Sequence, residues 1–423
     1  MIPHTVLRLL GRLRATVDET SARERLAPRH DRPSRSWRLV REASPGSVMA
    51  YWRRLLADTP AGYAERAEIA DPASVLGAAR YSANIESYVG TVKVPVGIVG
   101  PLRVNGLNAR GDYLVPLATT EAALVASYAR GAEALARSGG ASAALLYEGV
   151  LRAPAFVFES LLQAGMFVDW VCRNVEALRE AAEATTRFGK LVEVNPVINS
   201  GTVFLLCRYT TGDASGQNMV TIATEALCRR IEAECPVRPR HWFLEGNYSG
   251  DKKGSYLGLS TGRGRKVTAE ALIPAEVVGR VLRTSVPGIL EYAKVAGLGA
   301  ILSGQLGAQG HYANGLAALY LATGQDVACV SESSVGITRM EDRGGDLHVS
   351  VTLPNILVGT VGGGTGLPSQ RAALRLMGLD GADKAAALAE VAACLCLAGE
   401  LSIMAALAEG HFAEAHRKLA RRA

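Results

Sequence analysis

One nearly continuous apolar stretch, Val391–Leu407, constrains the fold of this chain more than any other segment. A stretch of this kind has to leave water, either into a protein core or into a membrane. Gly399 and Glu400 interrupt it, so it falls short of the roughly 18 uninterrupted apolar residues that a membrane span needs. We therefore expect a soluble protein with no transmembrane segment.

Length and composition are those of a large globular protein. The chain has 423 residues, of which 48% are hydrophobic, 20% are charged and 45 are glycine. These values exclude a disordered, collagen-like or coiled-coil chain, and the length predicts two or three domains. The seven cysteines form no CxxC pair, so we expect neither a metal site nor a disulfide framework. Residues 1–27 lack the features of a secretion signal, and the expected location is the cytoplasm.

The net charge of +6 is concentrated at the N-terminal end, where residues 1–54 contain twelve arginines against five acidic residues. A basic arm can bind nucleic acid or an anionic membrane surface. The aromatic residues and motifs of nucleic-acid-binding modules are missing, however. We expect residues 1–45 to form a solvated, flexible arm and expect no nucleic-acid partner.

Hydrophobic periodicity divides the rest of the chain into a large and a small unit. Residues 46–80 are expected to be helical, with one helix from Val48 to Arg66. Residues 154–245 alternate strand-like and helical segments, which predicts a small inserted α+β domain. The flanking residues 81–153 and 246–423 then form one large domain of helices and sheet. The expected fold class is α+β.

Single elements are also predicted. An Ala-rich helix is expected from Thr119 to Ser138, with Glu121 in its first turn and Gly139-Gly140 as its end. Extended chain is expected over 92–104, mainly helical segments over 274–298, 306–324 and 371–399, and a strand over 346–357.

Four polar groups stand out because the apolar composition of the segments around them predicts that these segments are buried. These groups are Glu121, Asp251-Lys252-Lys253, Asp326 and His416. If they converge, they supply an acid, a cation, an orienting carboxylate and a second acid. Taken singly, each has an ordinary alternative as a helix cap, a solvated loop residue, a turn residue or a surface histidine.

A glycine-rich loop, Gly359–Gly366, follows an apolar stretch and precedes a helix. Its backbone N–H groups could approach a diphosphate closely. It matches neither the GxGxxG dinucleotide fingerprint nor the GxxxxGK[ST] loop. A tight turn between two packed elements explains it equally well.

Six motifs in the same order resemble those of 3-hydroxy-3-methylglutaryl-coenzyme A (HMG-CoA) reductases, in their eukaryote- and archaeon-like class. They are VPVGIVGPL (94–102), VPLATTE (115–121), TGDASGQN (211–218), GNYSGDKK (246–253), GQD (324–326) and VGTVGGGT (358–365). The resemblance covers about residues 80–420 and corresponds to the soluble catalytic part of that family.

The resemblance implies an enzyme that reduces HMG-CoA to mevalonate and coenzyme A with two hydrides from NADPH. Lys252 is then the cation that stabilises charge on the carbonyl oxygen, and Asp326 keeps it charged and oriented. Glu121 is the acid of the second reduction, with a pKa raised by burial. His416 protonates the departing thiolate, and His411 is the less favoured alternative.

The binding residues are also implied by the resemblance. Arg187 suits the 2′-phosphate of the nucleotide, which favours NADPH over NADH. The implied NADPH-binding residues are Thr186, Arg187, Asp213, Ser215, Asn218, Gly362, Gly363, Gly364 and Thr365. The implied substrate-binding residues are Arg152, Asn247, Lys253, Lys294 and Asn314.

The family resemblance further implies that the small domain is ferredoxin-like and that the protein is a homodimer or homotetramer. The active site would lie at the subunit interface, where Lys252 faces Glu121 and Asp326 of the neighbouring subunit. We therefore expect those two carboxylates and Lys252 to come from different chains.

Four residues depart from the family pattern, namely Ser87, Ala122, Ala129 and Glu245. Glu245 stands where a small serine is usual, and a second carboxylate there repels the substrate unless it pairs with a cation. Two alternatives therefore stay open beside the NADPH-dependent reductase: a catalytically impaired binding or regulatory relative, and an NAD-preferring enzyme that oxidises mevalonate.

Overall fold

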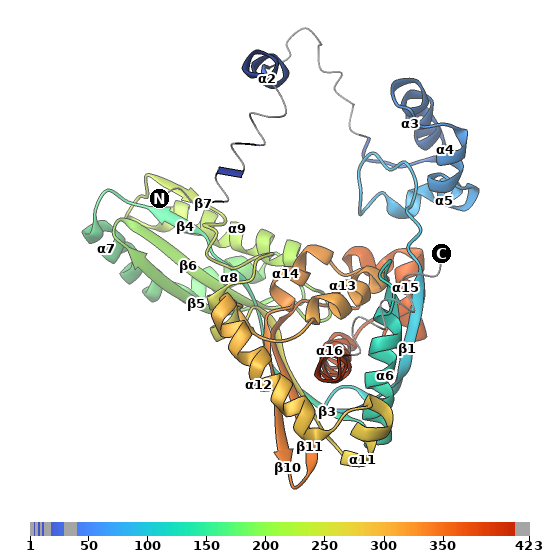
Figure 1. Ribbon diagram of the computed structural model, residues 1–423. Coiled ribbons are helices and arrows are strands. Elements are labelled where there is room, and N and C mark those ends of the chain that lie inside the picture. The colour runs from blue at the N-terminus through green and yellow to red at the C-terminus, as the bar shows by residue number, and fades with distance from the viewer. Residues whose placement is uncertain (1–3, 5–6, 9–10, 12–17, 29–39, 411–423) are drawn as a thin grey trace.

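The fold is described from a computed structural model, which covers residues 40–410 and 18–28 together with positions 4, 7, 8 and 11. Helices and strands are mixed in one α+β chain, as expected. A large unit of sheet and helices carries a smaller unit on one side, and α16 runs through the middle of the large unit (Figure 1). Within the arm expected over residues 1–45, Glu19–Leu26 is a helix, α2, capped by Asp18. The flexible arm stays a prediction; within it this segment is helical, because the Asp18 carboxylate satisfies two N–H groups at its start.

The sheet of the large unit has the strand order β2-β1-β3-β8-β11-β10-β9. Its strands are β1 (Val96–Gly106), β2 (Arg110–Ala118), β3 (Ala141–Arg152), β8 (Gly264–Ile273), β9 (Gly307–Ala308), β10 (Gly336–Arg343) and β11 (Asp346–Ile356). The pairs β1–β3 and β9–β10 are parallel and the other neighbours are antiparallel. The strand expected over 346–357 is thus confirmed as β11. The segment 92–104 was expected to be extended chain broken by turns and not an ordinary sheet strand; from Val96 onward it is strand β1, with one irregularity between Val99 and Leu102.

The apolar stretch that dominates the sequence lies in α16 (Ala385–Ala408), which is buried along almost its whole length. It packs against the sheet and against α6 (Leu124–Arg137), α12 (Val286–Ser303) and α13 (Tyr312–Thr323). Gly131 marks the closest approach of α6, since a Cβ there would lie 1.8 Å from the carbonyl oxygen of Ala398.

Glu390 shows how a carboxylate is accommodated inside this apolar helix. It is fully buried and accepts hydrogen bonds from the backbone N–H groups of Asn108, Ala109 and Leu145. These donors lie in the β1–β2 turn and in β3, so one buried group joins the core helix to the sheet. A buried charge is tolerated only when it is satisfied in this way.

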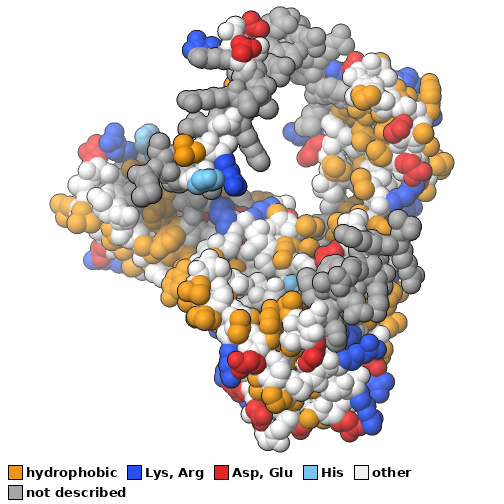
Figure 2. Space-filling model, viewed as in Figure 1, with side chains coloured by type: hydrophobic (Ala, Val, Ile, Leu, Met, Phe, Trp, Pro, Cys, Tyr) orange, Lys and Arg blue, Asp and Glu red, His pale blue; other side chains and the backbone are white. Residues whose placement is uncertain are grey.

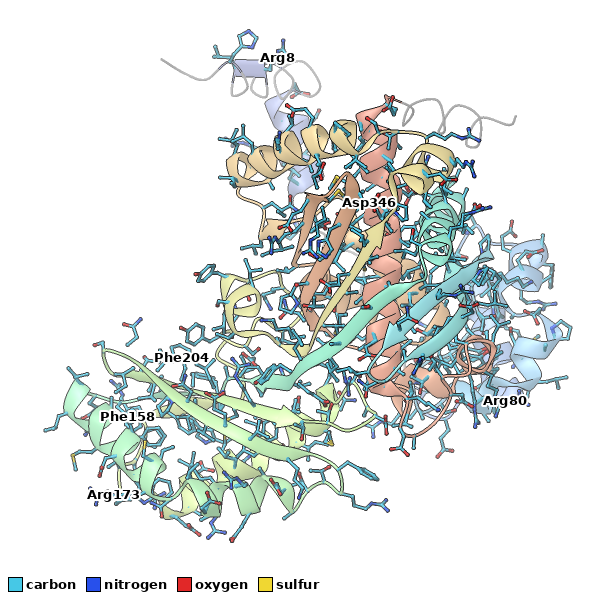
Figure 3. All side chains as sticks on the ribbon, turned by 90° about the horizontal axis from the view of Figure 1, so that it is seen from below. Arg8, Arg80, Phe158, Arg173, Phe204 and Asp346 are labelled. Atoms are coloured by element: carbon cyan, nitrogen blue, oxygen red, sulfur yellow. The ribbon has the colours of Figure 1, made fainter. Side chains whose placement is uncertain are left out.

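The smaller unit is inserted between β3 and the loop that contains Lys252. Its elements follow the order β4 (Ala155–Val157), α7 (Leu161–Arg173), α8 (Val175–Glu183), β5 (Lys190–Asn199), β6 (Thr202–Thr210), α9 (Gln217–Glu234) and β7 (His241–Phe243). The strands pair antiparallel in the order β7-β4-β6-β5, and β6 also pairs with the end of β3. Phe158 packs on Phe167 of α7 with ring centroids 4.9 Å apart, in the core of this unit (Figure 3).

Several predicted helices are shorter or divided in the structure. The helix expected from Val48 to Arg66 is two helices, α3 (Pro45–Asp58) and α4 (Tyr63–Ile69), because Pro60 between them cannot continue a helix. The helix expected from Thr119 begins only at Leu124, because Ala123 has a left-handed backbone with φ +70°. It ends before Gly139-Gly140 as predicted.

The three segments predicted as mainly helical contain breaks. They comprise α11 (Ala275–Val277), η2 (Val278–Leu282) and α12 in the first, β9 and α13 in the second, and α15 (Pro368–Leu376) and α16 in the third. The remaining short elements are α5 (Pro72–Leu76), η1 (Ala78–Tyr81), α10 (Tyr256–Thr261), η3 (Val327–Cys329), α14 (Val330–Ser333) and η4 (Gly363–Gly366).

Two described helices, α12 and α16, are long and apolar enough to cross a bilayer by composition. Helix α16 is the core helix of the large unit, so its apolar surface is already covered by protein. Helix α12 instead exposes Val295, Leu298, Ile301 and Leu302. Apolar side chains gather on this face of the molecule (Figure 2).

Candidate active site

The centre of the candidate site is an ion pair between Lys252 and Asp326. The Nζ of Lys252 lies 2.8 Å from Oδ2 of Asp326. Lys252 belongs to the loop between β7 and α10, and Asp326 follows the C-terminal end of α13. The hydrogen bond with Asp326 raises the pKa of Lys252, so the ammonium is charged at neutral pH. Two of the four predicted catalytic groups thus meet, 74 positions apart in the sequence.

Asp326 also lines a cavity of about 340 Å³. Three segments form this cavity: Ala214–Met219, Gly324–Asp326, and Gly359 with Val361–Thr365. The predicted NADPH-binding residues Ser215, Asn218, Gly362, Gly363, Gly364 and Thr365 are therefore brought together next to the ion pair.

The geometry of the glycine loop is explained better by a ligand that approaches it than by a simple turn between packed elements. Gly362 and Gly363 have φ angles of +73° and +54°, and a Cβ at either would meet open space. On the inner side, a Cβ at Gly359 would lie 2.5 Å from the backbone nitrogen of Ser215. The loop is packed tightly on its inner side and open toward the cavity, an arrangement in which backbone N–H groups can contact a phosphate or a ribose.

Asp213 caps the start of the core helix α16. Its carboxylate accepts hydrogen bonds from the backbone N–H groups of Asp383, Lys384 and Ala385, at the start of α16. Burial opposes ionisation here, but these hydrogen bonds outweigh it and lower the pKa of Asp213. The side chain of Asp213 caps the core helix, whereas the other two predicted cofactor residues of this segment, Ser215 and Asn218, line the cavity.

Thr186 and Arg187 lie beside this cavity rather than in its wall. The Oγ1 of Thr186 donates to Sδ of Met219 at 2.9 Å, and Met219 lines the cavity. Arg187 is exposed next to it. An exposed guanidinium in this place is suited to a phosphate group at the rim of the cavity.

Arg152 does not present a free guanidinium. It is buried, and its Nη1 lies 3.3 Å from Glu245 and 3.1 Å from Asp251. Glu245, the departure that was expected to repel a substrate carboxylate, is therefore paired with a cation. Lys253 donates to the carbonyl oxygen of Asp251 at 3.0 Å, and Asn247 lies in the same loop with φ +61°.

Glu121 lies in the turn before α6 and is exposed, so the expectation of a buried acid is wrong for the single chain. Its two carboxylate oxygens accept from Nδ2 of Asn314 at 3.4 and 3.3 Å. Asn314 is in the first turn of α13 and Asp326 follows the last turn. The helical rise places about 14 Å of helix between them.

The predicted catalytic residues of one chain thus form two separate half-sites, Glu121 with Asn314 and Lys252 with Asp326. The prediction that Asp326 faces Lys252 from a neighbouring subunit is wrong, because the pair forms within one chain. Lys294 belongs to neither half-site: it is exposed on α12 and pairs with Glu291 at 3.1 Å. His416 and His411 lie outside the described residues.

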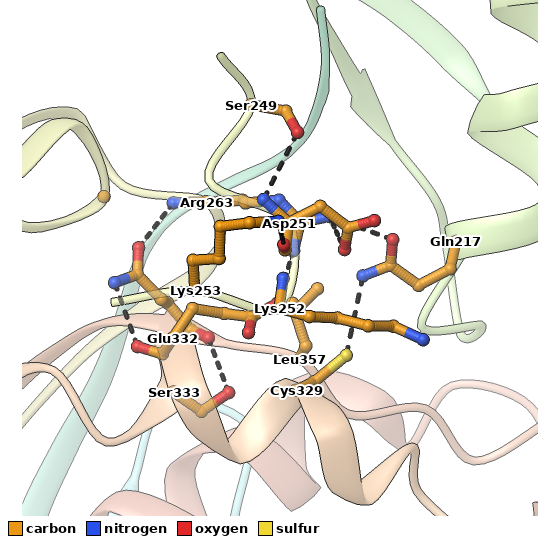
Figure 4. A network of polar contacts seen from close by, with 12 residues as sticks. Gln217, Ser249, Asp251, Lys252, Lys253, Arg263, Cys329, Glu332, Ser333 and Leu357 are labelled. Carbon is orange, nitrogen blue, oxygen red and sulfur yellow. Dashed lines mark hydrogen bonds and ion pairs between the residues drawn. The ribbon is translucent and has the colours of Figure 1, made fainter. Parts of the chain in front are cut away.

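A largely buried network around Lys252 was not anticipated from the sequence (Figure 4). Arg263 donates to Glu332, to Asp251 and to Gln217 at 2.7, 2.7 and 2.9 Å. Burial raises the pKa of Glu332 to about 7. The one sequence signal was a pair of arginines, Arg263 and Arg265, at the start of a strand that is otherwise mostly apolar.

Arg265 is the second buried arginine of this strand, at 2% exposure. It donates to the carbonyl oxygens of Gly212 and Val358, which precede the two loops that wall the cavity. Among the described residues, no cluster of His, Cys, Asp and Glu is arranged to hold a metal ion.

Fold and site together define an α+β protein with a cation–carboxylate pair at a glycine-lined cavity, between a large unit and an inserted smaller one. A family model described as hydroxymethylglutaryl-coenzyme A reductase matches residues 55–421. The chain belongs to this family, which confirms the resemblance noted in the sequence.

Archaeal relatives support the same assignment. The chain is 45% identical over 340 residues to the 3-hydroxy-3-methylglutaryl-coenzyme A reductase of Methanothermobacter thermautotrophicus, covering 80% of this chain and 85% of the relative. It is 46% identical over 348 residues to that of Aeropyrum pernix, covering 81% and 82%.

A solved structure shares the fold. It is the class II reductase from Streptococcus pneumoniae bound to NADPH in open conformations, with a TM-score of 0.64 and 20% identity. The match covers 86% of this chain and 97% of that one.

Proposed function

We propose that this chain catalyses the NADPH-dependent, four-electron reduction of HMG-CoA to mevalonate and coenzyme A, a reaction of the mevalonate pathway of isoprenoid biosynthesis. The observation that carries the proposal is the Lys252–Asp326 ion pair at the edge of the glycine-lined cavity. Family membership supplies the substrate, and the charged groups of the site suit its chemistry.

Bound NADPH would supply the hydride, and the chain's own residues would manage charge and protons. Each hydride addition builds negative charge on a carbonyl oxygen. A fixed ammonium stabilises that charge without reorganisation, which is the part we assign to Lys252. Asp326 orients the ammonium and keeps it protonated. Ser215, Asn218, Thr365 and the glycine loop offer hydroxyl, amide and backbone donors suited to holding the nucleotide.

A second charged cavity supports an acyl-coenzyme A substrate. It has a volume of about 890 Å³ and is lined by Arg130, Arg137, Arg280 and Arg283. Glu133 and Glu276 pair with Arg137 and Arg280, which leaves an excess of positive charge. The cavity borders the second half of α6, from Arg130 to Arg137, away from the end of the helix that follows Glu121, and its positive charge suits the phosphates of coenzyme A.

We also propose that two chains complete each active site, in a homodimer or homotetramer. The separation of Glu121 from Lys252 along α13 supports this, since the acid and the cation must reach the same carbonyl group. The exposed apolar face of α12 is consistent with a covered interface. Lys294 on that helix would then be carried to the substrate, and His416 remains the proposed proton donor to the thiolate.

The domain division is retained as part of the proposal, with residues 154–245 as the NADPH-binding domain and 81–153 with 246–423 as the HMG-CoA-binding domain. The β-α-β-β-α-β order and the β7-β4-β6-β5 strand order support a ferredoxin-like fold for the small domain. Cytoplasmic location is likewise a proposal.

A spectrophotometric assay tests the function directly. Purified protein with HMG-CoA should oxidise two equivalents of NADPH per thioester and release free thiol.

One specific observation favours a second candidate, a binding or regulatory relative: Arg152 is already engaged by Glu245 and Asp251. That candidate predicts thermal stabilisation by HMG-CoA without turnover. Absence of cofactor oxidation above background rejects the reductase.

A further inference from the structure

The backbone of Lys252 is held in a conformation that a lysine does not adopt unaided. Its φ angle is +56°, in the left-handed region that disfavours residues with a Cβ. The loop around it lacks regular secondary structure. Something outside the loop must therefore hold this residue, because a strained backbone persists only where its surroundings over-determine it.

Glu332 supplies that contact. Its Oε1 accepts a hydrogen bond from the backbone N–H of Lys252 at 3.1 Å, and it accepts from Nη1 of Arg263 at 2.7 Å. Glu332 and Arg263 are each 1% exposed. The second oxygen, Oε2, has no partner among the described residues, so the carboxylate is positioned through Oε1 alone.

Arg263 holds the loop from its other side. Its Nη2 donates to Oδ1 of Asp251, the residue that precedes Lys252, at 2.7 Å. The same nitrogen lies 2.9 Å from Oε1 of Gln217, which lines the glycine-rich cavity. One buried guanidinium therefore connects Asp251 and Glu332, which both adjoin the Lys252 backbone, to Gln217 in the wall of the proposed cofactor site (Figure 4).

We propose that Glu332 and Arg263 are positioning residues for Lys252, which act by fixing its backbone so that the ammonium meets the developing oxyanion. This inference rests on the proposed reductase function. The pair forms no hydrogen bond or ion pair with Asp326; it contacts the loop at Lys252 and Asp251, and the cavity wall at Gln217. Its loss should lower kcat and leave the binding of HMG-CoA and NADPH nearly unchanged, because positioning of the cation matters most in the transition state.

The test separates positioning from stability. Replacing a buried ion pair by apolar residues of similar volume is often neutral for folding. The double variant Arg263→Met/Glu332→Leu should therefore remain folded while kcat falls by about 100-fold, the effect of misplacing a catalytic group by about 1 Å. KM for HMG-CoA and the NADPH dissociation constant should stay near the wild-type values. Ser331→Ala, an exposed change in the same helix, is the matched control.

The conservative variant Glu332→Gln retains an oxygen acceptor for the backbone N–H of Lys252. It should therefore keep most of the wild-type kcat. This variant tests the proposal even if the double variant does not fold. Wild-type kcat in the folded double variant, or a loss in Glu332→Gln as large as 100-fold in a folded protein, overturns the positioning role. Failure of the proposed function is distinguishable, because wild-type protein itself would then oxidise no NADPH.

Discussion

The Nδ2 of Asn314 lies 3.3 Å from Oε2 of Glu121, at the opposite end of α13 from the pair formed by Lys252 and Asp326. One helix therefore separates the proposed acid from the proposed cation. If both act on one carbonyl group, they must come from different chains.

Mixed oligomers test this arrangement. Glu121→Gln and Lys252→Ala should each be nearly inactive alone. Random pairing of equal amounts makes half of the dimers mixed, and each mixed dimer has one intact site of two. Co-refolded mixtures should therefore regain about a quarter of the wild-type activity. Measurement of kcat before and after mixing checks this. No recovery in mixtures proven to contain hetero-oligomers would contradict a shared site.

Removal of the Lys252 ammonium group should lower kcat far more than it weakens the binding of HMG-CoA. Lys252→Met is expected to lower kcat by about 100- to 1,000-fold, equivalent to about 2.7–4 kcal/mol, as for loss of one oxyanion donor. Asp326→Asn should cost less in the Lys252→Met background than in the wild type, because its partner is already gone. Steady-state kinetics of the two single variants and the double variant measure this coupling.

Lys93→Met provides the control for charge removal, since Lys93 lies ahead of β1 and pairs with Glu68 and Asp71. It should keep wild-type kcat. Additive effects of Lys252→Met and Asp326→Asn would show that the ion pair is not functionally coupled.

Cofactor choice should depend on Arg187. Arg187→Asp places a carboxylate where a 2′-phosphate is expected, so KM for NADPH should rise and the preference for NADPH over NADH should narrow or invert. Arg173→Asp on α7 makes the same charge change at an exposed site of the same unit. Unchanged preference in Arg187→Asp would remove this residue from the cofactor site, and a strong wild-type preference for NADH would favour the oxidative alternative.

The free energy of unfolding should depend on pH through the titration of Glu332. Its pKa in the folded state is about 7, above the ordinary value of 4.5, mainly because of burial. Between these values the folded protein binds more protons than the unfolded chain, so this group's contribution to the free energy of unfolding falls as pH rises. Glu332→Gln does not titrate. The stability of wild type relative to Glu332→Gln should therefore decrease from pH 5 to about pH 7.

Urea unfolding at several pH values measures this difference. Glu180→Gln, an exposed change on α8, controls for the general effect of removing one carboxylate. A difference between wild type and Glu332→Gln that rises with pH would mean that the carboxylate is stabilised in its charged form by Arg263.

Much of the site could be predicted from residue order alone. The motifs around Glu121, Lys252 and Asp326 and the glycine loop were sufficient to indicate the family, and Ser215, Asn218 and Thr365 do meet at one cavity. Local patterns were weaker at boundaries. Ala123, with its left-handed backbone, carries no side-chain signal for that conformation, so α6 was predicted to start too early.

The sequence by itself determined which residue types are present, the α+β class and the burial of the Val391–Leu407 stretch, because these depend on local propensity and hydrophobicity. Only the tertiary structure decided that Asp213 caps α16, that Glu245 neutralises Arg152 and that Glu332 holds Lys252. Each of these contacts joins residues that are remote in the chain. Hydrophobic periodicity reports which face of an element is buried, whereas the partner of a buried charge is set by how the elements pack.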